Sequence, residues 1–393
     1  MTTWHILTGE FPPQPGGVSD YTHAVARGLA ASGDRVTVWA PPSGVSPETA
    51  SPALDGVAVR RLPDRFGLNA LRELDRELDR GRGPHRLLVQ YVPHAFGWKA
   101  LNVPFCLWLR SRRRDSIWVM FHEVAFPIDR RQRLARNLVG VVTRRMASIV
   151  AGVAERAYVS IPAWEPVLRE LTSSPLPIHW LPVPSTIPVV RDPSAIAQVR
   201  LRLTASREPL VGHFGTYGAL IRPQLDNALT ALLSASNDAR VLLLGRGSDR
   251  AAADFLQAHP EARGRVTGAG DLPPRDVSVH LSACDVLMQP YPDGISGRRT
   301  SAMAGLSHAR PVVTTGGPLT EAIWRQPTGV VLCPAEEPGE MARQTLALLG
   351  DRARRLRLSE EARAVYDARF DIRHTIAALR APARGDVELG AAS

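Results

Sequence analysis

Short apolar strands alternate with helical stretches along all 393 residues, and this alternation predicts an α/β fold. The expected architecture is two Rossmann-like, doubly wound domains that face each other across a cleft. The length favours two domains, because a single core rarely grows beyond about 250–300 residues. A proline-rich stretch at 176–193 is interpreted as the linker. We therefore expect domains at 1–185 and 186–370, with a last helix at about 371–381 packing back on the first domain.

The first domain is predicted from apolar runs of strand length that are separated by amphipathic segments. Ser19 is the expected N-cap of the first helix, and Gly33 is expected to end it. The expected helices span 19–32, 68–80 and 130–146. The expected strands span 5–8, 35–39, 57–62, 87–91, 116–121, 148–153 and 157–161.

The second domain repeats the same pattern after the prolines. Its expected strands span 210–214, 241–244, 265–267, 286–289, 311–315 and 329–332, with helices between them. A helix over 351–370 is expected to end the domain.

Composition narrows the function class. The formal net charge is +10, carried almost entirely by arginine, since Lys99 is the only lysine. No nucleic-acid-binding signature accompanies this charge, so phosphate-bearing ligands or an anionic membrane face are the expected partners, and nucleic acid is not. The three cysteines are widely separated, which predicts no disulfide framework, no metal site and a cytoplasmic location. The N-terminus lacks the features of a signal peptide. No cofactor is expected.

A glycine pair, Gly16 and Gly17, lies between the first strand and the first helix. Backbone N–H groups and the helix dipole favour anions at such a position, so we expect a ligand loop there. The alternative is a plain turn. His122 ends the strand at 116–121, at the sheet edge where α/β proteins bind ligands. The alternative for His122 is an ordinary surface histidine.

Two loops of the second domain are predicted to hold a diphosphate. The first follows the strand at 210–214, with Gly215 and Thr216 in the turn and Arg222 supplying charge. The second follows the strand at 286–289, where Asp293 stands before a helix expected to begin near Gly297. Its other expected contacts are Gly294, Ile295, Ser296, Arg298 and Arg299. The alternative is a structural turn beside solvated arginines.

Two basic runs occur in the first domain, at 110–114 and at 130–145. Leu134, Leu138, Val141 and Val142 fall within the second run. A basic amphipathic helix of this kind lies on anionic lipid, which predicts a peripheral position on the inner face of a membrane. The alternative is a solvated helix face with a buried apolar stripe.

Taken in order, these segments resemble the family 4 glycosyltransferases of GT-B fold over nearly the whole chain. The match is strongest over 286–294, 302–305 and 309–315, and the proline-rich Gly16–Gly17 loop resembles the family's opening loop. The family carries two glutamates separated by seven residues, whereas here the two positions are Asp293 and Ser301. The resemblance implies that Asp293 contacts the donor sugar and that Ser301 meets the ribose without a charge.

The resemblance implies a retaining transfer of a sugar from a UDP- or GDP-sugar to an acceptor hydroxyl, without a metal. His122 would orient the sugar, in part through its carbonyl, and Arg222 would bind phosphate. The nucleobase would lie beside Thr267, Gly268 and Ala269. Tyr91, His94 and Trp98 follow a strand and are expected to line the acceptor site, for a lipid-linked glycan or a natural product. The alternatives are a non-catalytic nucleotide-sugar-binding protein and a nucleotide-sugar epimerase.

Overall fold

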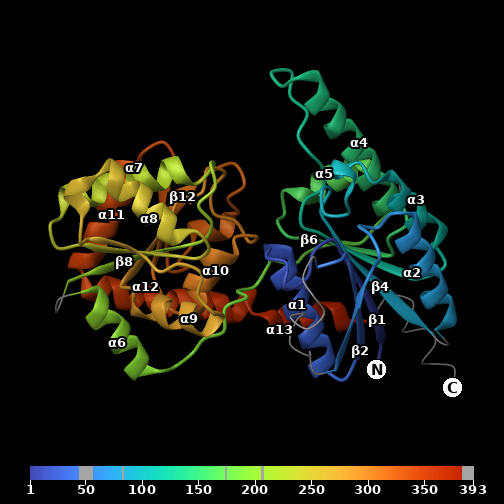
Figure 1. Ribbon diagram of the computed structural model, residues 1–393, viewed down its shortest axis with the longest axis horizontal. Coiled ribbons are helices and arrows are strands. Elements are labelled where there is room, and N and C mark those ends of the chain that lie inside the picture. Colours follow the sequence, from blue (N-terminus) through green and yellow to red (C-terminus); the bar gives the residue numbers. More distant parts are fainter. Residues whose placement is uncertain (44–55, 82–83, 173–174, 205–207, 383–393) are drawn as a thin grey trace. The chain divides into compact units, whose positions relative to one another are not determined.

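The computed structural model describes residues 1–43, 56–81, 84–172, 175–204 and 208–382 (Figure 1). The chain forms two compact units. Unit 1 comprises Met1–Pro182 together with Ile372–Ser393, and unit 2 comprises Val183–Asp371. Both units are Rossmann-like, with strands that pair in parallel, so the predicted α/β class and its two doubly wound domains are confirmed.

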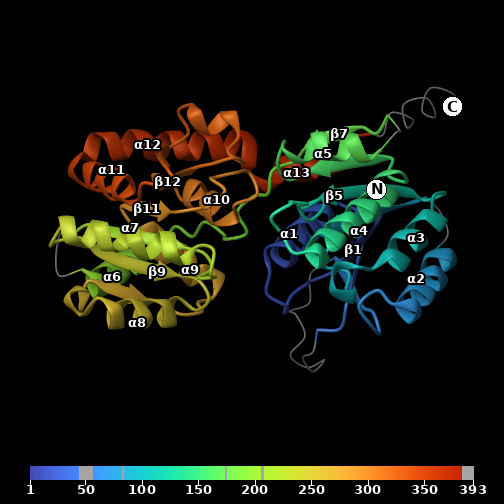
Figure 2. The same cartoon turned by 90° about the horizontal axis from the view of Figure 1, so that it is seen from above.

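Unit 1 holds a seven-stranded sheet in the order β3-β2-β1-β4-β5-β6-β7, with helices around it (Figure 2). Two chains of packed helices accompany this sheet: α1 packs against α13, whereas α2, α3, α4 and α5 pack in succession. The strands are β1 (Thr3–Thr8), β2 (Arg35–Ala40), β3 (Val57–Arg61), β4 (His85–Tyr91), β5 (Ser116–Phe121), β6 (Arg156–Val159) and β7 (Ile178–Trp180). The helices are α1 (Gly17–Ala31), α2 (Leu68–Arg80), α3 (Val103–Ser111), α4 (Leu134–Ala151), α5 (Trp164–Leu171) and α13 (Ile372–Arg380).

Unit 2 holds a six-stranded sheet in the order β10-β9-β8-β11-β12-β13. Helices α7 and α11 pack together on one face, and α6 and α9 pack together on the other (Figure 1). The strands are β8 (Leu210–Phe214), β9 (Arg240–Leu244), β10 (Val266–Gly268), β11 (Val286–Gln289), β12 (Val312–Gly316) and β13 (Val330–Pro334). The helices are α6 (Pro193–Leu203), α7 (Arg222–Ala235), α8 (Ser248–Ala258), α9 (Pro274–Ala283), α10 (Thr300–Ser307), α11 (Pro338–Gly350) and α12 (Arg352–Val365). A π-helical turn, Tyr366–Phe370, follows α12.

The C-terminal helix α13 is fastened to unit 1 by buried polar contacts. The Asp34 carboxylate, with its side chain 1% exposed, pairs with Arg380 at 3.1 Å. The same carboxylate accepts hydrogen bonds from the Thr2 amide and the Trp4 indole. The Tyr158 hydroxyl donates to the Ala378 carbonyl at 2.9 Å. These contacts join the end of the chain to β1 and β6.

Two predicted elements of unit 1 are wrong. The strand expected over 148–153 is the last part of α4 and the turn after it, because Met146, Ala147, Val150 and Ala151 repeat at helical spacing and are buried together. The linker expected from residue 176 begins later, since Ile178–Trp180 forms the edge strand β7. Proline is tolerated beside an edge strand, which explains why the prolines there do not prevent pairing.

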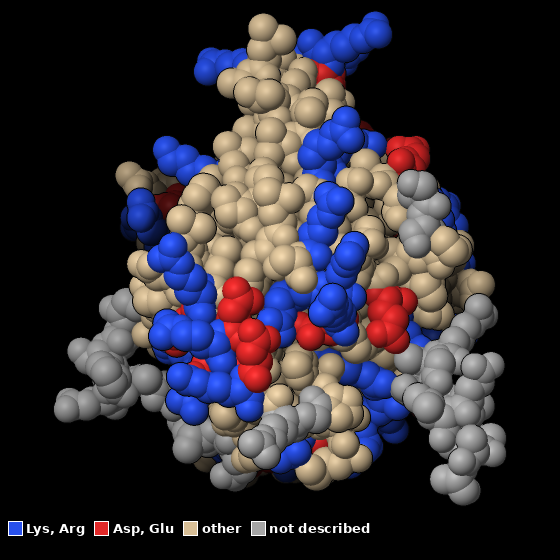
Figure 3. Space-filling view, turned by 90° about the vertical axis from the view of Figure 1, so that its right-hand side faces the viewer, with Lys and Arg blue, Asp and Glu red and all other residues tan. Residues whose placement is uncertain are grey.

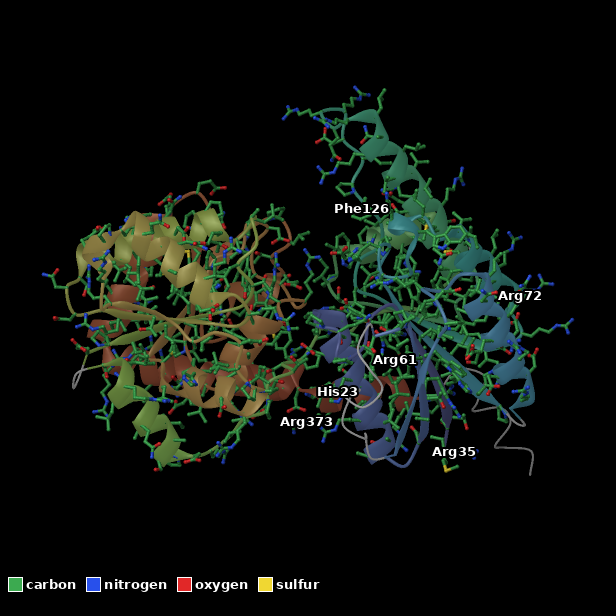
Figure 4. All side chains as sticks on the ribbon, in the orientation of Figure 1. His23, Arg35, Arg61, Arg72, Phe126 and Arg373 are labelled. Carbon is green, nitrogen blue, oxygen red and sulfur yellow. The ribbon has the colours of Figure 1, made fainter. Side chains whose placement is uncertain are left out.

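The N-terminal end of helix α4 projects beyond the rest of unit 1, and Phe126 lies near the base of this projection (Figure 4). The Phe126 amide donates to Thr143 Oγ1, and Asn137 bonds to the backbone of Asp129, so the preceding loop folds back on the helix. None of the helices in the described ranges combines the length and apolarity that crossing a bilayer requires.

Candidate functional site

Buried polar atoms without a partner gather at the carboxyl ends of β8 and β11 in unit 2. They are His213 Nε2, Gln289 Oε1 and Ser296 Oγ, on side chains that are no more than 2% exposed. Buried polar groups are ordinarily hydrogen-bonded, so three such atoms on adjacent segments indicate a place built for a polar ligand. Sequence reasoning missed His213 and Gln289, although each lies at a strand end as His122 does.

The His213 ring is neutral, and its free nitrogen is an acceptor. Burial lowers the pKa of His213 to about 4. Its Nδ1 lies 2.9 Å from the Met288 carbonyl, which only accepts, so Nδ1 carries the proton and Nε2 carries a lone pair. A methyl group on Gly215 would lie 3.7 Å from this Nε2 and 3.8 Å from Ser301 Oγ. Gly215 therefore lies directly beside both side chains.

Ser301 belongs to a second part of the same cluster. Its hydroxyl lies 2.7 Å from the Tyr291 hydroxyl, and the Arg299 guanidinium lies 4.6 Å from the centre of the Tyr291 ring. The Tyr291 hydroxyl also bonds to the Ala302 backbone, and burial raises the pKa of Tyr291. Helix α10 begins at Thr300, three residues later than the expected start near Gly297, because residues 294–299 form a loop.

Asp293 holds both arginines of that loop. Its carboxylate bonds to Arg298 at 2.7 Å and also to Arg299. The three side chains are 21–27% exposed, so solvent reaches this group of charges. The structure thus brings Asp293, Arg298 and Arg299 together and pairs them with one another.

Residues 315–324 bind the backbone of the loop at 294–299. Gly297 N donates to Glu321 Oε1 at 2.8 Å, Ile295 N donates to the Thr315 carbonyl, and Glu321 Oε2 accepts from the Trp324 indole. Burial raises the pKa of Glu321. The Gly297 amide, expected to face an anion, is therefore bound to a carboxylate of the same chain.

Arg222 and the glycine pair also have internal partners. Arg222 Nε bonds to both oxygens of Asp226, at 2.8 and 2.9 Å, and its Nη2 donates to the Ala251 carbonyl. In unit 1, Glu10 Oε1 accepts from the amides of Val18 and Ser19. That carboxylate caps α1, so Ser19 is not its N-cap; Gly16 is. An anion beside Gly16 and Gly17 would have to displace Glu10.

The residues expected beside the nucleobase lie at the end of β10. Gly268 packs against α8, where a Cβ would lie 2.2 Å from the Ser248 carbonyl, so only glycine fits. Thr267 and Ala269 line a pocket of about 560 Å³ together with Leu242 and Leu272. Thr216 is exposed.

His122 is buried at the end of β5, and its Nε2 lies 2.8 Å from Gln90 Oε1. Burial lowers its pKa to about 3, so the ring is neutral near pH 7. Its carbonyl already accepts from the Ser160 hydroxyl and the Trp164 indole, which leaves no lone pair for orienting a sugar. The expected carbonyl role is therefore corrected. The His122 ring packs edge-on with the Tyr21 ring, with the ring centres 4.9 Å apart.

The three expected acceptor residues are placed differently. Tyr91 is fully buried in the core of unit 1 and cannot line a site, because Phe96 and Phe121 cover its ring. His94 is exposed and lies near the Phe126 ring. Trp98 is 52% exposed. Among the described residues, no group of three or more His, Cys, Asp or Glu side chains is arranged to hold a metal ion.

Comparison with known proteins agrees with this architecture. Residues 213–351 match the profile of a family described as glycosyl transferases group 1. The matched residues lie within unit 2 and are similar to the group 1 glycosyltransferases. No curated protein matches it by sequence.

Solved structures resemble this chain over its full length. Sucrose-phosphate synthase from Thermosynechococcus elongatus has a TM-score of 0.71 at 17% identity, with 100% of each chain covered. Anabaena HepE, solved in complex with UDP-glucose, has a TM-score of 0.67 at 16% identity, with 100% of each chain covered. A trehalose 6-phosphate synthase from Burkholderia multivorans has a TM-score of 0.67 at 13% identity, again over 100% of each chain. At these identities the likeness establishes the GT-B fold.

Proposed function

We propose that this glycosyltransferase moves a sugar from a UDP- or GDP-linked donor to an acceptor hydroxyl, with retention at the anomeric carbon. Unit 2 holds the donor and unit 1 holds the acceptor. The observation that carries the proposal is the cluster of unpartnered atoms His213 Nε2, Gln289 Oε1 and Ser296 Oγ. The first two are acceptors, and the hydroxyl groups of a ribose or a sugar supply the donors that they lack. A UDP-glucose complex of HepE, a protein of the same fold, supports a nucleotide-sugar ligand.

The donor diphosphate is assigned to Arg298 and Arg299. In the structure their partner is the Asp293 carboxylate, an anion that occupies the position a phosphate would take. Phosphate binding would release Asp293 toward the donor sugar. The two guanidinium groups would then stabilise the negative charge that develops on the departing diphosphate. Arg222 is not part of this proposal, since its donors are bound to Asp226 and Ala251.

Other contacts complete the proposed donor site. The nucleobase is assigned to the segment of Gly268 and Ala269, beside the pocket lined by Thr267. Gly215 allows the ligand to approach His213 and Ser301 closely. In unit 1, the neutral ring of His122 would not act as a base, because burial lowers its pKa to about 3.

Isothermal titration calorimetry with UDP and GDP tests whether a diphosphate replaces Asp293 as the partner of Arg298 and Arg299. Asp293→Asn removes the carboxylate that competes with phosphate, so we expect it to bind the nucleotide about tenfold more tightly while losing sugar transfer. Asp226→Asn is the matched control, because it removes the carboxylate bound to Arg222 instead, and its nucleotide affinity should equal that of the wild type. Tighter binding by the control alone would move the phosphate site to Arg222. A wild-type protein that binds neither nucleotide would refute the donor site.

A second candidate function is a non-catalytic nucleotide-sugar-binding protein. Ser301 favours it, because this position has no acidic side chain and its hydroxyl is already bonded to Tyr291. Donor hydrolysis and transfer to a broad acceptor set distinguish the two functions. Tight nucleotide binding without turnover of any donor would favour the binding protein.

We also propose that the projecting end of α4 docks on an anionic membrane, which would place the protein at the cytoplasmic face of a membrane and its acceptor among lipid-linked glycans. Apolar side chains there are exposed: Leu134 by 87%, Leu138 by 63% and Ile128 by 49%. Figure 3 shows an uncharged tip at the top of this face, with basic side chains on both sides of it and an acidic group below it. The arginines of this segment are Arg130, Arg131, Arg133 and Arg136, all exposed. Apolar side chains ringed by arginine fit an anionic lipid surface.

Sedimentation with lipid vesicles tests the docking. The protein should pellet with phosphatidylglycerol vesicles and remain in solution with pure phosphatidylcholine. Leu134→Gln together with Leu138→Gln should abolish pelleting, whereas Leu201→Gln, a comparably exposed leucine on α6, should not. Equal pelleting of all three proteins would exclude α4 as the docking segment.

A further inference from the structure

The loops that follow β3 and β4 in unit 1 are bonded to each other and form one platform. The Asn102 side-chain amide donates to the Phe66 carbonyl at 3.0 Å and to the Phe96 carbonyl at 2.6 Å. The Phe66 ring packs edge-on against Phe96, and Phe105 stacks on Phe96 with the ring centres 4.2 Å apart. Both loops leave the carboxyl edge of the sheet, where α/β proteins bind their ligands.

The second loop turns outward from this platform in a strained conformation. Trp98, Lys99 and Ala100 have φ values of 53°, 52° and 71°, in the left-handed region that residues other than glycine rarely adopt. Gly97 precedes them at φ 85°, and a Cβ there would lie 2.9 Å from the Arg65 carbonyl. Strain of about 1–3 kcal/mol per residue is typical of ligand-binding segments. Here it leaves the large Trp98 ring 52% exposed, which does not contribute to the core.

Trp98 forms one wall of a pocket of about 410 Å³. Leu68, 60% exposed, adds apolar surface, and polar groups come from Asp64, Arg65, Asn69 and Arg72. Arg72 extends from α2 in Figure 4. An open aromatic face beside a carboxylate, an amide and guanidinium groups matches a pyranose, which has one apolar C–H face and a rim of hydroxyls that both donate and accept.

We propose that this pocket binds a sugar ring of the acceptor, with the apolar face of the ring stacked on Trp98. The inference rests on the proposed function, because it names the acceptor as a glycan. Asp64 and Asn69 would bond to the hydroxyls of the ring. The pocket lies wholly within unit 1, so it binds the sugar without the donor.

Saturation-transfer NMR on the full chain, without nucleotide, tests the pocket. The probes are the methyl glycosides of glucose, galactose, mannose and N-acetylglucosamine. The wild type should bind at least one of them. Trp98→Ala should weaken that binding by about tenfold or more, and Trp98→Phe should retain most of it. Leu107→Ala is the control, because Leu107 is 49% exposed on α3 and does not line the pocket.

The outcomes separate this inference from the proposed function. If no glycoside binds the wild type, or if Trp98→Ala binds as the wild type does, the sugar pocket is refuted. Titration of the wild type with UDP and GDP reports on the donor site independently, so a wild type that binds a glycoside but neither nucleotide refutes the proposed function and leaves the sugar pocket in place. Should Trp98→Ala fail to fold, Asn69→Ala on the exposed face of α2 replaces it, with a loss of several-fold expected.

Discussion

Gly294 is the position in the donor loop where the backbone leaves least room for change. Its φ is +85°, and a Cβ would lie 2.2 Å from Thr320 Oγ1 and 2.4 Å from Gly317 N. Thr320 cannot turn away without cost, since its hydroxyl accepts a hydrogen bond from Gly317 N at 3.0 Å. Gly294→Ala must therefore shift the backbone of one loop or the other.

The cost of Gly294→Ala has three parts. The left-handed conformation costs about 1–2 kcal/mol for alanine. Overpacking against the Gly317 backbone adds about 1–3 kcal/mol. The lost Thr320 hydrogen bond adds about 1 kcal/mol. We expect unit 2 to lose about 3–6 kcal/mol of its free energy of unfolding, and the loop to lose nucleotide affinity with it.

Gly264→Ala is the matched control. Gly264 has a similar φ of +76° but nothing within 4 Å of its Cβ position, so only the conformational cost of about 1–2 kcal/mol remains. Urea unfolding followed by fluorine NMR of 5-fluorotryptophan isolates unit 2, because Trp324 is the only tryptophan in residues 183–371. If the two variants unfold at the same urea concentration, the clash with Gly317 and Thr320 does not exist.

Further predictions concern buried groups. His213 has a pKa of about 4 in the folded protein and an ordinary pKa of about 6.5 when unfolded, so only the unfolded state gains a proton as pH falls from 6.5 to 4. The stability of unit 2 should fall by about 1.4 kcal/mol per pH unit over that range from this group alone. In His213→Gln, the loss of stability of unit 2 per pH unit should be smaller by that amount. Urea unfolding at pH 7 and pH 5 measures this loss, and an equal loss in the variant and the wild type would contradict the assignment. Asp34→Ala should cost unit 1 about 3 kcal/mol, because Arg380 and the Trp4 indole lose a buried acceptor. Hydrogen exchange of α13 should rise in Asp34→Ala and stay unchanged in Asp238→Ala, a surface control.

The sequence predicts the two sheets well because hydrophobic periodicity reports which residues are buried. Strands over 210–214 and 286–289 coincide with β8 and β11. The failure at 148–153 has the same origin, since Ile149 and Val150 form a short apolar run that periodicity alone does not assign to helix or strand. Strand β7 was missed because Pro177 and Pro182 flank it, and proline is informative only where the sheet position is known.

The sequence also predicts which loops end at the carboxyl edges of the sheets, but it does not predict what those loops contact. Glu321 lies 24 residues from Gly297, and nothing local to either residue indicates that they are bonded. Gln289 bonds to Phe214, and His213 bonds to Met288, only because β8 and β11 are neighbours in the sheet. Partner choice over such separations is a property of the folded chain.

The anion contacts predicted from sequence share one feature, which is that a carboxylate of the chain occupies them: Glu10 at α1, Asp226 on Arg222, Glu321 on Gly297 and Asp293 on Arg298. The physical features that attract phosphate also attract the chain's own acids. These contacts can still be ranked by how readily a phosphate would replace the carboxylate. Arg222 is held by two oxygens of Asp226 and by a backbone carbonyl, so a phosphate there would have to break three bonds. The Asp293 carboxylate is shared between two partly exposed arginines that a diphosphate can bridge, so its replacement exchanges one anion for another of higher charge. This difference is the reason that we propose Arg298 and Arg299, and not Arg222, as the phosphate contacts.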